Sequence, residues 1–259
     1  MTSVAADRPG RVNEDYTGAL PTAAVLVDGA GIPGGERVCS HGVAWYAHRL
    51  GGSLLGLLTL GGDLPSVLAG AIDEVTNAHR GTCDVADPIS PSASVAMLRV
   101  RDGVAEHLVL GDSFVLLDRI GREALVVTDP REVVIARAFQ TRLVGVPAGG
   151  DEYRRIIGEL RANRNRPGGF WLAKDDPGAA GEAITGSCPP AELNSATLLS
   201  NGASRIVDRF GLVDWPGLPA LLGSAGPAEI VRLVRDAEAR EKVAADDATI
   251  AHCTGLGQG

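Results

Sequence analysis

Two segments near the N-terminus decide the fold of this chain: Arg11-Val12-Asn13-Glu14-Asp15-Tyr16 and Ala23-Ala24-Val25-Leu26-Val27-Asp28-Gly29-Ala30-Gly31. The second segment reads as a buried strand that ends in a carboxylate. Ionised carboxylates are rarely placed against an apolar core unless they are paired or bind a metal. The pattern therefore predicts that Glu14, Asp15 and Asp28 begin an acidic metal site.

Composition fits a soluble protein with a substantial core, as one large domain or two small ones, and no linker that would separate two domains is evident. The chain has 259 residues, 45% of them hydrophobic, and a formal net charge of −8. We expect a single domain over residues 1–253, followed by a flexible tail over 254–259. The acidic balance and the lack of a long basic block argue against nucleic acid or an anionic membrane as the main partner. The most apolar run, Leu54 to Leu60, is much shorter than the roughly 20 residues that span a bilayer.

The four cysteines predict a reducing compartment. Cys39, Cys83, Cys188 and Cys253 are widely spaced and form no C-x-x-C motif, so zinc-ribbon and thioredoxin interpretations gain no support. We expect reduced thiols. The N-terminal residues lack the basic and apolar regions of a signal peptide, which predicts a cytoplasmic location.

Hydrophobic periodicity predicts helices and strands in separate blocks. Antiparallel pairing follows, with an α+β fold and not a doubly wound parallel sheet. The strands after the first helix pair should form one meander, the first helix should be weakened or kinked at Gly51-Gly52, and 174–195 should be loop-like. The expected helices are 41–60, 64–78, 132–142, 152–162, 179–185, 203–210 and 227–243; the expected strands are 23–27, 92–100, 104–110, 114–117, 124–128, 170–172, 197–199 and 248–253.

Polar residues recur where the predicted strands end. Asp28, Asp112 and Asn201 each follow a strand, and Asp246-Asp247 precede the last one. Any single one of these is explained by turn chemistry. The ordered set favours a site for hard divalent cations, which take several oxygen ligands. Two such ions roughly 3.5–4 Å apart can activate water and clamp a phosphoryl group.

The order of five motifs carries a family resemblance. Asn13-Glu14-Asp15, Val27-Asp28-Gly29, Gly111-Asp112-Ser113, Leu199-Ser200-Asn201-Gly202 and Asp246-Asp247-Ala248-Thr249 follow one another along the chain. In this order they resemble the type 2C metal-dependent protein serine/threonine phosphatases, as a divergent bacterial member, from about Arg11 to Ile250. The resemblance implies a four-layer α-β-β-α sandwich, with two antiparallel sheets flanked by helices and Mn2+ or Mg2+ at one end of the sheets.

The resemblance also implies roles for single residues. Glu14 would ligate one metal, Asp28 would bridge two metals, and Asp15 would support the site. Arg11 is the best substitute for the family's phosphate-binding arginine and Arg8 is the next. The remaining implied positions are the Gly29 carbonyl and Asp246 as ligands, Asp112 as a structural residue, and Asp129 as a ligand of a third, looser ion.

The sequence departs from the family at Asn201. The family has Asp there, and Asn removes one negative charge from a site for divalent ions. We expect weaker affinity for one metal and reduced or absent turnover. Arg205 stands where relatives often carry a second Asp; it would bind phosphate or be an exposed helix residue, and the latter is favoured.

Two functions from different classes follow from the resemblance. The first is a Mn2+/Mg2+-dependent phosphatase, in which a metal-bridged hydroxide at Asp28 attacks phosphoserine, phosphothreonine or a small phosphoester. The second is a non-catalytic pseudophosphatase that binds a phosphorylated or protein partner through the same surface. Asn201 favours the second function.

Three other patterns have competing interpretations. Gly29-Ala30-Gly31-Ile32-Pro33-Gly34 matches G-x-G-x-x-G, but Pro33 and the absence of a parallel β-α-β pattern argue against dinucleotide binding. One face of the first predicted helix carries His41, Trp45 and His48. These side chains could form a metal or active-site group, but packing against the core is the favoured interpretation. Residues 142–190 are a candidate lid whose Arg161, Arg164 and Arg166 would steer a phosphorylated substrate, with solvated surface as the default.

Overall fold

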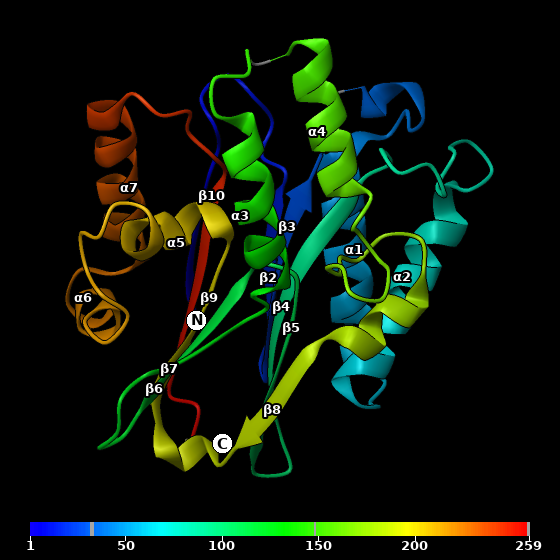
Figure 1. Ribbon diagram of the computed structural model, residues 1–259. Helices are drawn as coiled ribbons and strands as arrows, with labels where there is room; N and C mark the ends of the chain where they lie inside the picture. Colours follow the sequence, from blue (N-terminus) through cyan, green and yellow to red (C-terminus); the bar gives the residue numbers. More distant parts are fainter. Residues whose placement is uncertain (32–33, 148, 258–259) are drawn as a thin grey trace.

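Two five-stranded antiparallel sheets lie face to face in the computed structural model, which describes residues 1–31, 34–147 and 149–257 (Figure 1). One sheet has the strand order β1-β10-β9-β6-β7 and the other β2-β3-β4-β5-β8. The strands are β1 Thr2–Ala6, β2 Asp15–Leu20, β3 Ala23–Ala30, β4 Ser92–Arg101, β5 Val104–Leu110, β6 Phe114–Arg119, β7 Leu125–Thr128, β8 Ile184–Cys188, β9 Leu193–Leu199 and β10 Ala248–Thr254.

Helices cover both outer faces of the sheets. In Figure 1, α1 and α2 lie on one side, α5, α6 and α7 lie on the other, and α3 and α4 stand at one end. The helices are α1 Gly42–Leu58, α2 Leu64–His79, α3 Arg131–Leu143, α4 Asp151–Arg161, α5 Asn201–Asp208, α6 Leu218–Ala225 and α7 Pro227–Glu241, with 3-10 turns η1 Gly35–Arg37, η2 Pro177–Glu182 and η3 Pro190–Glu192.

Buried apolar residues form three clusters, which fill the interfaces between four layers: helices, sheet, sheet and helices. Alternation along β3 shows how one strand contributes to two of them. Val25 and Val27 pack against α1 and α2, whereas Ala24 and Leu26 pack between the two sheets. A third cluster joins the sheet containing β9 and β10 to α5, α6 and α7. The predicted four-layer α-β-β-α sandwich is confirmed.

The predicted single meander is wrong, because the chain changes sheets between β5 and β6. β4 pairs with β5 in one sheet, whereas β6 pairs with β7 and β9 in the other. Gly111 makes this change with a φ of +81°, and a Cβ there would lie 2.7 Å from the Ser94 Cβ. Alternating apolar residues followed by a turn signal are the same in sequence whether the turn joins two paired strands or leads from one sheet to the other.

The predicted weakening or kink at Gly51-Gly52 does not interrupt α1, which runs as one continuous helix over this pair. The ring of Tyr16 on β2 occupies the place of a side chain at Gly51, where a Cβ would lie 2.0 Å from its Cδ1 atom. Gly51 therefore lets β2 and α1 approach closely.

Several short elements differ from the sequence predictions. Residues 170–172 form no extended strand, because the Asn165 side chain binds both the N–H and the carbonyl of Leu172, at 2.8 and 2.9 Å. The segment 174–195, expected to be a loop with a helix at 179–185, contains β8 at the edge of a sheet, after a 3-10 turn at 177–182. α6 was not predicted.

The described part of the chain contains no helix with both the length and the apolar character needed to cross a membrane. The G-x-G-x-x-G match is not a dinucleotide fingerprint, because β3 and β4 pair antiparallel. Ile32 and Pro33 of that motif, Ala148 of the 142–190 segment, and residues 258–259 of the expected tail lie outside the described residues.

Candidate metal centre

Strand ends from both sheets meet at a cleft of about 660 Å³. Asp28 lies near the end of β3, Asp112 follows β5, Asn201 begins α5 after β9, and Asp246 precedes β10. Because the strands are antiparallel, these termini lie at one end of the sandwich. In Figure 1, α3 and α4 stand at the same end. The sequence prediction that these residues come together agrees with this arrangement.

Asp28, Asn201 and Asp112 form a hydrogen-bonded row across the two sheets. The backbone N–H of Asn201 donates to Asp28 Oδ2 at 3.0 Å, and its side-chain Nδ2 donates to Asp112 Oδ2 at 2.8 Å. Burial raises the pKa of Asp28 well above its ordinary value, and the nearby charges of Asp15 and Asp112 add to the effect. Burial likewise raises the pKa of Asp112. None of the three side chains in this row carries a positive charge that would offset the two carboxyl groups.

Arg8 joins a second group of carboxylates. Its guanidinium hydrogen-bonds Glu14 and lies 3.4 Å from an Asp247 oxygen and 3.7 Å from an Asp246 oxygen. Asp247 in turn accepts the backbone N–H groups of Arg8 and Glu14, at 2.7 and 2.9 Å. Asp247 thus holds the N-terminal segment against β10, and Arg8 takes a larger part at the site than the sequence suggested.

Arg205 is not the exposed helix residue that the sequence favoured. Its Nη2 donates to Asp246 Oδ2 at 2.8 Å, and its Nη1 donates to Glu238 Oε1 at 2.7 Å and to the Ala244 carbonyl at 3.0 Å. Glu238 is buried, with 2% of its surface exposed. Arg205 therefore fixes Asp246 from the side of α5 and α7 and supplies it with a counter-charge.

Asp15 lies beneath the cleft and does not line it. It stands opposite Asp28 in the β2–β3 register and is 4% exposed. Burial raises its pKa to about 6, with the charges of Asp247 and Asp246 adding repulsion. Its Oδ2 has no hydrogen-bond partner among the described residues. This position fits the supporting role that the resemblance implied.

Two glycines allow the backbone of the site to close up. A Cβ at Gly29 would lie 2.4 Å from the carbonyl oxygen of Glu14, and one at Gly202 would lie 1.9 Å from that of Asp247. The Gly29 N–H donates to the same Glu14 carbonyl at 3.2 Å. Side chains at these positions would force the acidic segments apart, which explains the Asp-Gly and Asn-Gly pairs physically.

Arg11 and Asp129 differ in their relation to the cleft. Arg11 lines it and is exposed. Asp129 is 2% exposed and does not line the cleft; the Arg131 guanidinium binds it, with an N–O distance of 2.7 Å. A third ion at Asp129 would have to compete with this ion pair.

Glu132 lines the cleft, and the sequence prediction missed it as a site residue. It stands in the first turn of α3, where a glutamate is usually explained by the helix dipole alone. Burial raises its pKa to about 8, with Asp112 adding to the shift and Arg164 opposing it. Arg164, from the expected lid, has buried Nε and Nη1 atoms without hydrogen-bond partners in the described structure.

The stripe on α1 is divided between several contacts. His48 lies with its Nε2 3.2 Å from the carbonyl oxygen of Asp15 and with its ring 5.6 Å from that of Tyr16. The Trp45 ring packs against those of His41 and His79, which also contact each other. Packing therefore accounts for Trp45 and His48, whereas the Nδ1 atom of His41 lies 3.2 Å from the Cys83 sulfur.

Comparison with known proteins gives structural likeness only. No protein-family model and no curated protein matches the sequence. PppA, described as a key regulatory component of T6SS in Pseudomonas aeruginosa, is 18% identical with a TM-score of 0.58, covering 97% of this chain and 95% of its own. The Mycobacterium tuberculosis serine/threonine phosphatase PstP/Ppp is 15% identical with a TM-score of 0.58, covering 98% and 97%.

A third solved structure agrees. The serine/threonine phosphatase Stp1 from Staphylococcus aureus is 13% identical with a TM-score of 0.61, covering 98% of this chain and 93% of its own. In each case the likeness extends over nearly the whole length of both chains. The chain therefore has the fold of type 2C serine/threonine phosphatases, the family that its ordered acidic motifs resemble.

Proposed function

We propose that the protein is a divalent-metal-dependent phosphoric monoester hydrolase, acting on phosphoserine or phosphothreonine in a protein or on a small phosphoester. The observation that carries the proposal is the convergence of Glu14, Asp28 and Asp246 on one cleft of this fold. Its acidic motifs also stand in the chain order of serine/threonine phosphatases. The likeness of fold to PstP/Ppp and Stp1 supports this choice.

The residues of the cleft fit Mn2+ or Mg2+. Carboxylate and carbonyl oxygens are the ligands of hard cations, and Glu14, Asp28, Asp246 and the Gly29 carbonyl would supply them. Burial and mutual repulsion raise the pKa of Asp28, and a bound dication would reverse that effect. When bound, such an ion lowers the pKa of water and neutralises charge on a phosphoryl group.

The chain's own residues orient these ligands and attract an anion. The Asn201 N–H holds one Asp28 oxygen, and Arg205 holds one Asp246 oxygen. Arg11 is exposed at the cleft and is free of the carboxylate contacts that occupy Arg8, within the described residues. A guanidinium binds phosphate through paired N–H groups, so Arg11 is the group that we assign to the phosphate.

A second function, that of a non-catalytic phospho-ligand or protein-binding module, is favoured by two specific contacts. Arg205 already neutralises Asp246, and the Asn201 amide donates to Asp112 where an Asp would add charge. Both contacts lower the negative charge available to a dication. Such a module would keep the cleft as a recognition surface without turnover.

Manganese-dependent hydrolysis of p-nitrophenyl phosphate separates the two functions. The wild type should hydrolyse it slowly, and Asn201→Asp should raise the rate at subsaturating Mn2+ by roughly tenfold or more, because a carboxylate binds a hard cation better than an amide does. Asp28→Asn should abolish the Mn2+-dependent rate.

The same variants supply a control that does not depend on turnover. Without metal, Asn201→Asp replaces a hydrogen bond to Asp112 with carboxylate repulsion, so it should lower the melting temperature in EDTA and show a larger Mn2+-induced rise than the wild type. If neither wild type nor Asn201→Asp hydrolyses the substrate and neither responds to Mn2+, the enzyme proposal is wrong and the binding module remains.

A further inference from the structure

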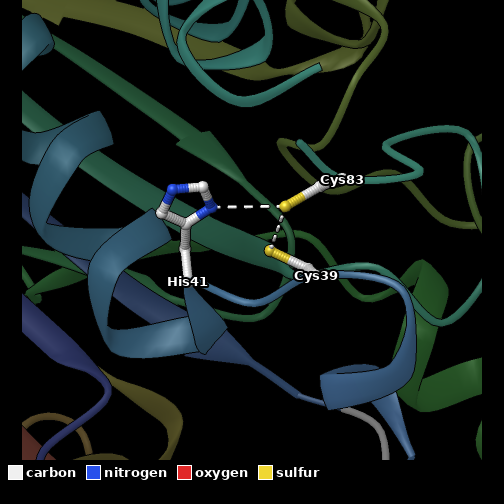
Figure 2. Close-up of side chains that lie close together, drawn as sticks. All are labelled: Cys39, His41 and Cys83. Atoms are coloured by element: carbon white, nitrogen blue, oxygen red, sulfur yellow. Dashed lines mark hydrogen bonds between the residues drawn. The ribbon is translucent and has the colours of Figure 1, made fainter. Parts of the chain in front are cut away.

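A second group of side chains of metal-ligating type lies where α1 begins and α2 ends. Figure 2 shows the Cys39 and Cys83 sulfurs and the His41 ring turned toward one another. The His41 Nδ1 atom is 3.2 Å from Cys83 Sγ, which is 3.3 Å from Cys39 Sγ. All three ligand atoms lie within 4.8 Å of one another. None of these residues lines the acidic cleft.

The fold brings the three ligands together from two loops. Cys39 and His41 precede α1, and Cys83 follows α2. The two helices pack against each other. The Asp84 N–H donates to the Val38 carbonyl at 2.9 Å, which fixes one loop against the other. Cys39 is 2% exposed, whereas His41 and Cys83 are half-buried. The cluster is therefore held by the backbone and open on one side.

Neighbouring groups orient the ligands. The His41 ring lies 4.3 Å from the ring of Trp45, with 30° between their planes, and 6.0 Å from that of His79, edge to face. These ring contacts hold the His41 imidazole beside the two sulfurs.

We propose that Cys39, His41 and Cys83 bind a zinc ion, with the fourth position taken by water or another exchangeable ligand. Thiolate and imidazole ligands select soft or borderline ions such as Zn2+, and not the Mg2+ or Mn2+ that suit carboxylates. Two cysteines and one histidine with one open position form a known zinc arrangement. The described cluster contains these three ligands.

The distance between the two sulfurs is close to that of a zinc site. The two sulfurs are 3.3 Å apart, against about 3.8 Å expected from Zn–S bonds of about 2.3 Å in tetrahedral geometry. The two sulfur atoms must therefore move apart by about half an ångström to bind zinc. The His41 ring, whose nitrogen already faces the sulfurs, distinguishes this arrangement from a disulfide, which needs the two cysteines alone.

The site is linked to the wall of the acidic cleft. The Cys39 N–H donates to the Gly35 carbonyl at 2.9 Å, and Gly35 lines the cleft. Ile89, from the loop after Cys83, lines it as well, and its carbonyl would lie 3.0 Å from a Cβ at Gly35. Zinc would thus tie together the two loops that form this wall.

Cobalt substitution tests the site directly. Co2+ gives thiolate charge-transfer bands only when cysteine binds it, so it reports this cluster and not the carboxylate cleft. The full chain, reduced and metal-free, should take up one Co2+ with these bands, and one equivalent of Zn2+ should displace it. Asp28→Asn, which disables the acidic cleft, should leave the bands unchanged.

Variants assign the ligands. Cys39→Ser, Cys83→Ser and His41→Ala should each weaken Zn2+ binding by more than the roughly 10–100-fold that a lost supporting contact costs. Cys188→Ser is the matched control, because it removes a thiol outside the cluster. Circular dichroism confirms that each variant is folded. The proposal is overturned if the reduced wild type shows no thiolate band, or if the cluster variants bind Zn2+ as tightly as Cys188→Ser.

Discussion

Glu132 illustrates how a single residue at the cleft couples to stability. Its pKa lies near 8 instead of the ordinary 4.5, chiefly because it is buried. The folded state therefore keeps a proton that the unfolded state releases between about pH 4.5 and pH 8. Because the unfolded state binds fewer protons over this range, the free energy of unfolding falls as the pH rises.

Glu132→Gln should remove this pH dependence. In EDTA at pH 8 the variant should be more stable than the wild type by on the order of 2 kcal/mol, a discounted value because the side chain borders the open cleft. Near pH 4.5 the two proteins should be equally stable. Urea unfolding at both pH values measures this, and an equal difference at both would show that the ionisation of Glu132 is not responsible.

Residue-level prediction reached the ligand candidates but not their counter-ions. Glu14, Asp28 and Asn201 could be found because each belongs to a short motif at a strand end. The role of Arg8, which binds Asp247 from 239 positions away, has no such local pattern. The sequence favours a surface position for Arg205, because periodicity cannot show that α7 places Glu238 beside it.

At the scale of elements, α1 shows that two neighbouring glycines can have different roles. Sequence rules treat Gly51-Gly52 as a weakness in a helix, whereas the structure uses Gly51 to admit the ring of Tyr16 from β2. Gly52 is exposed, and a Cβ there would meet no atom within 4 Å. Alanine should therefore have opposite effects on stability at these two neighbouring positions.

Gly51→Ala should destabilise the protein by about 2–3 kcal/mol, because the added methyl group overlaps the Tyr16 ring. Gly52→Ala is its matched control and should stabilise the protein by up to about 1 kcal/mol through helix propensity. Chemical unfolding of both variants measures the difference. Equal effects would contradict the close contact between β2 and α1.

Elements were predicted best where periodicity and length were strong. The long helices and β3, β4, β5 and β10 lie close to their expected ranges. β8 and α6 were missed because a short edge strand and an eight-residue helix carry few periodic positions. The assignment of strands to sheets failed at Gly111, since turn chemistry does not encode which sheet comes next.

At the scale of the whole molecule, the two sheets bring acidic groups together that neither sheet holds alone. Asp28 belongs to the sheet of β3, whereas Asn201 and Asp246 flank strands of the other sheet. The sandwich could be anticipated from the order of the acidic motifs. The ion pairs that Glu14 and Asp246 make with Arg8 and Arg205 could not, because no local sequence pattern marks either pair.

Calorimetric titration of Mn2+ into the metal-free protein tests the central claim most directly, since the thiolate cluster does not select this ion. The wild type should bind Mn2+, Asn201→Asp should bind it roughly tenfold or more tightly, and Asp28→Asn should lose most of the heat. Wild-type protein that binds no Mn2+, or Asp28→Asn protein that binds it as well as the wild type, would contradict a metal centre in this cleft.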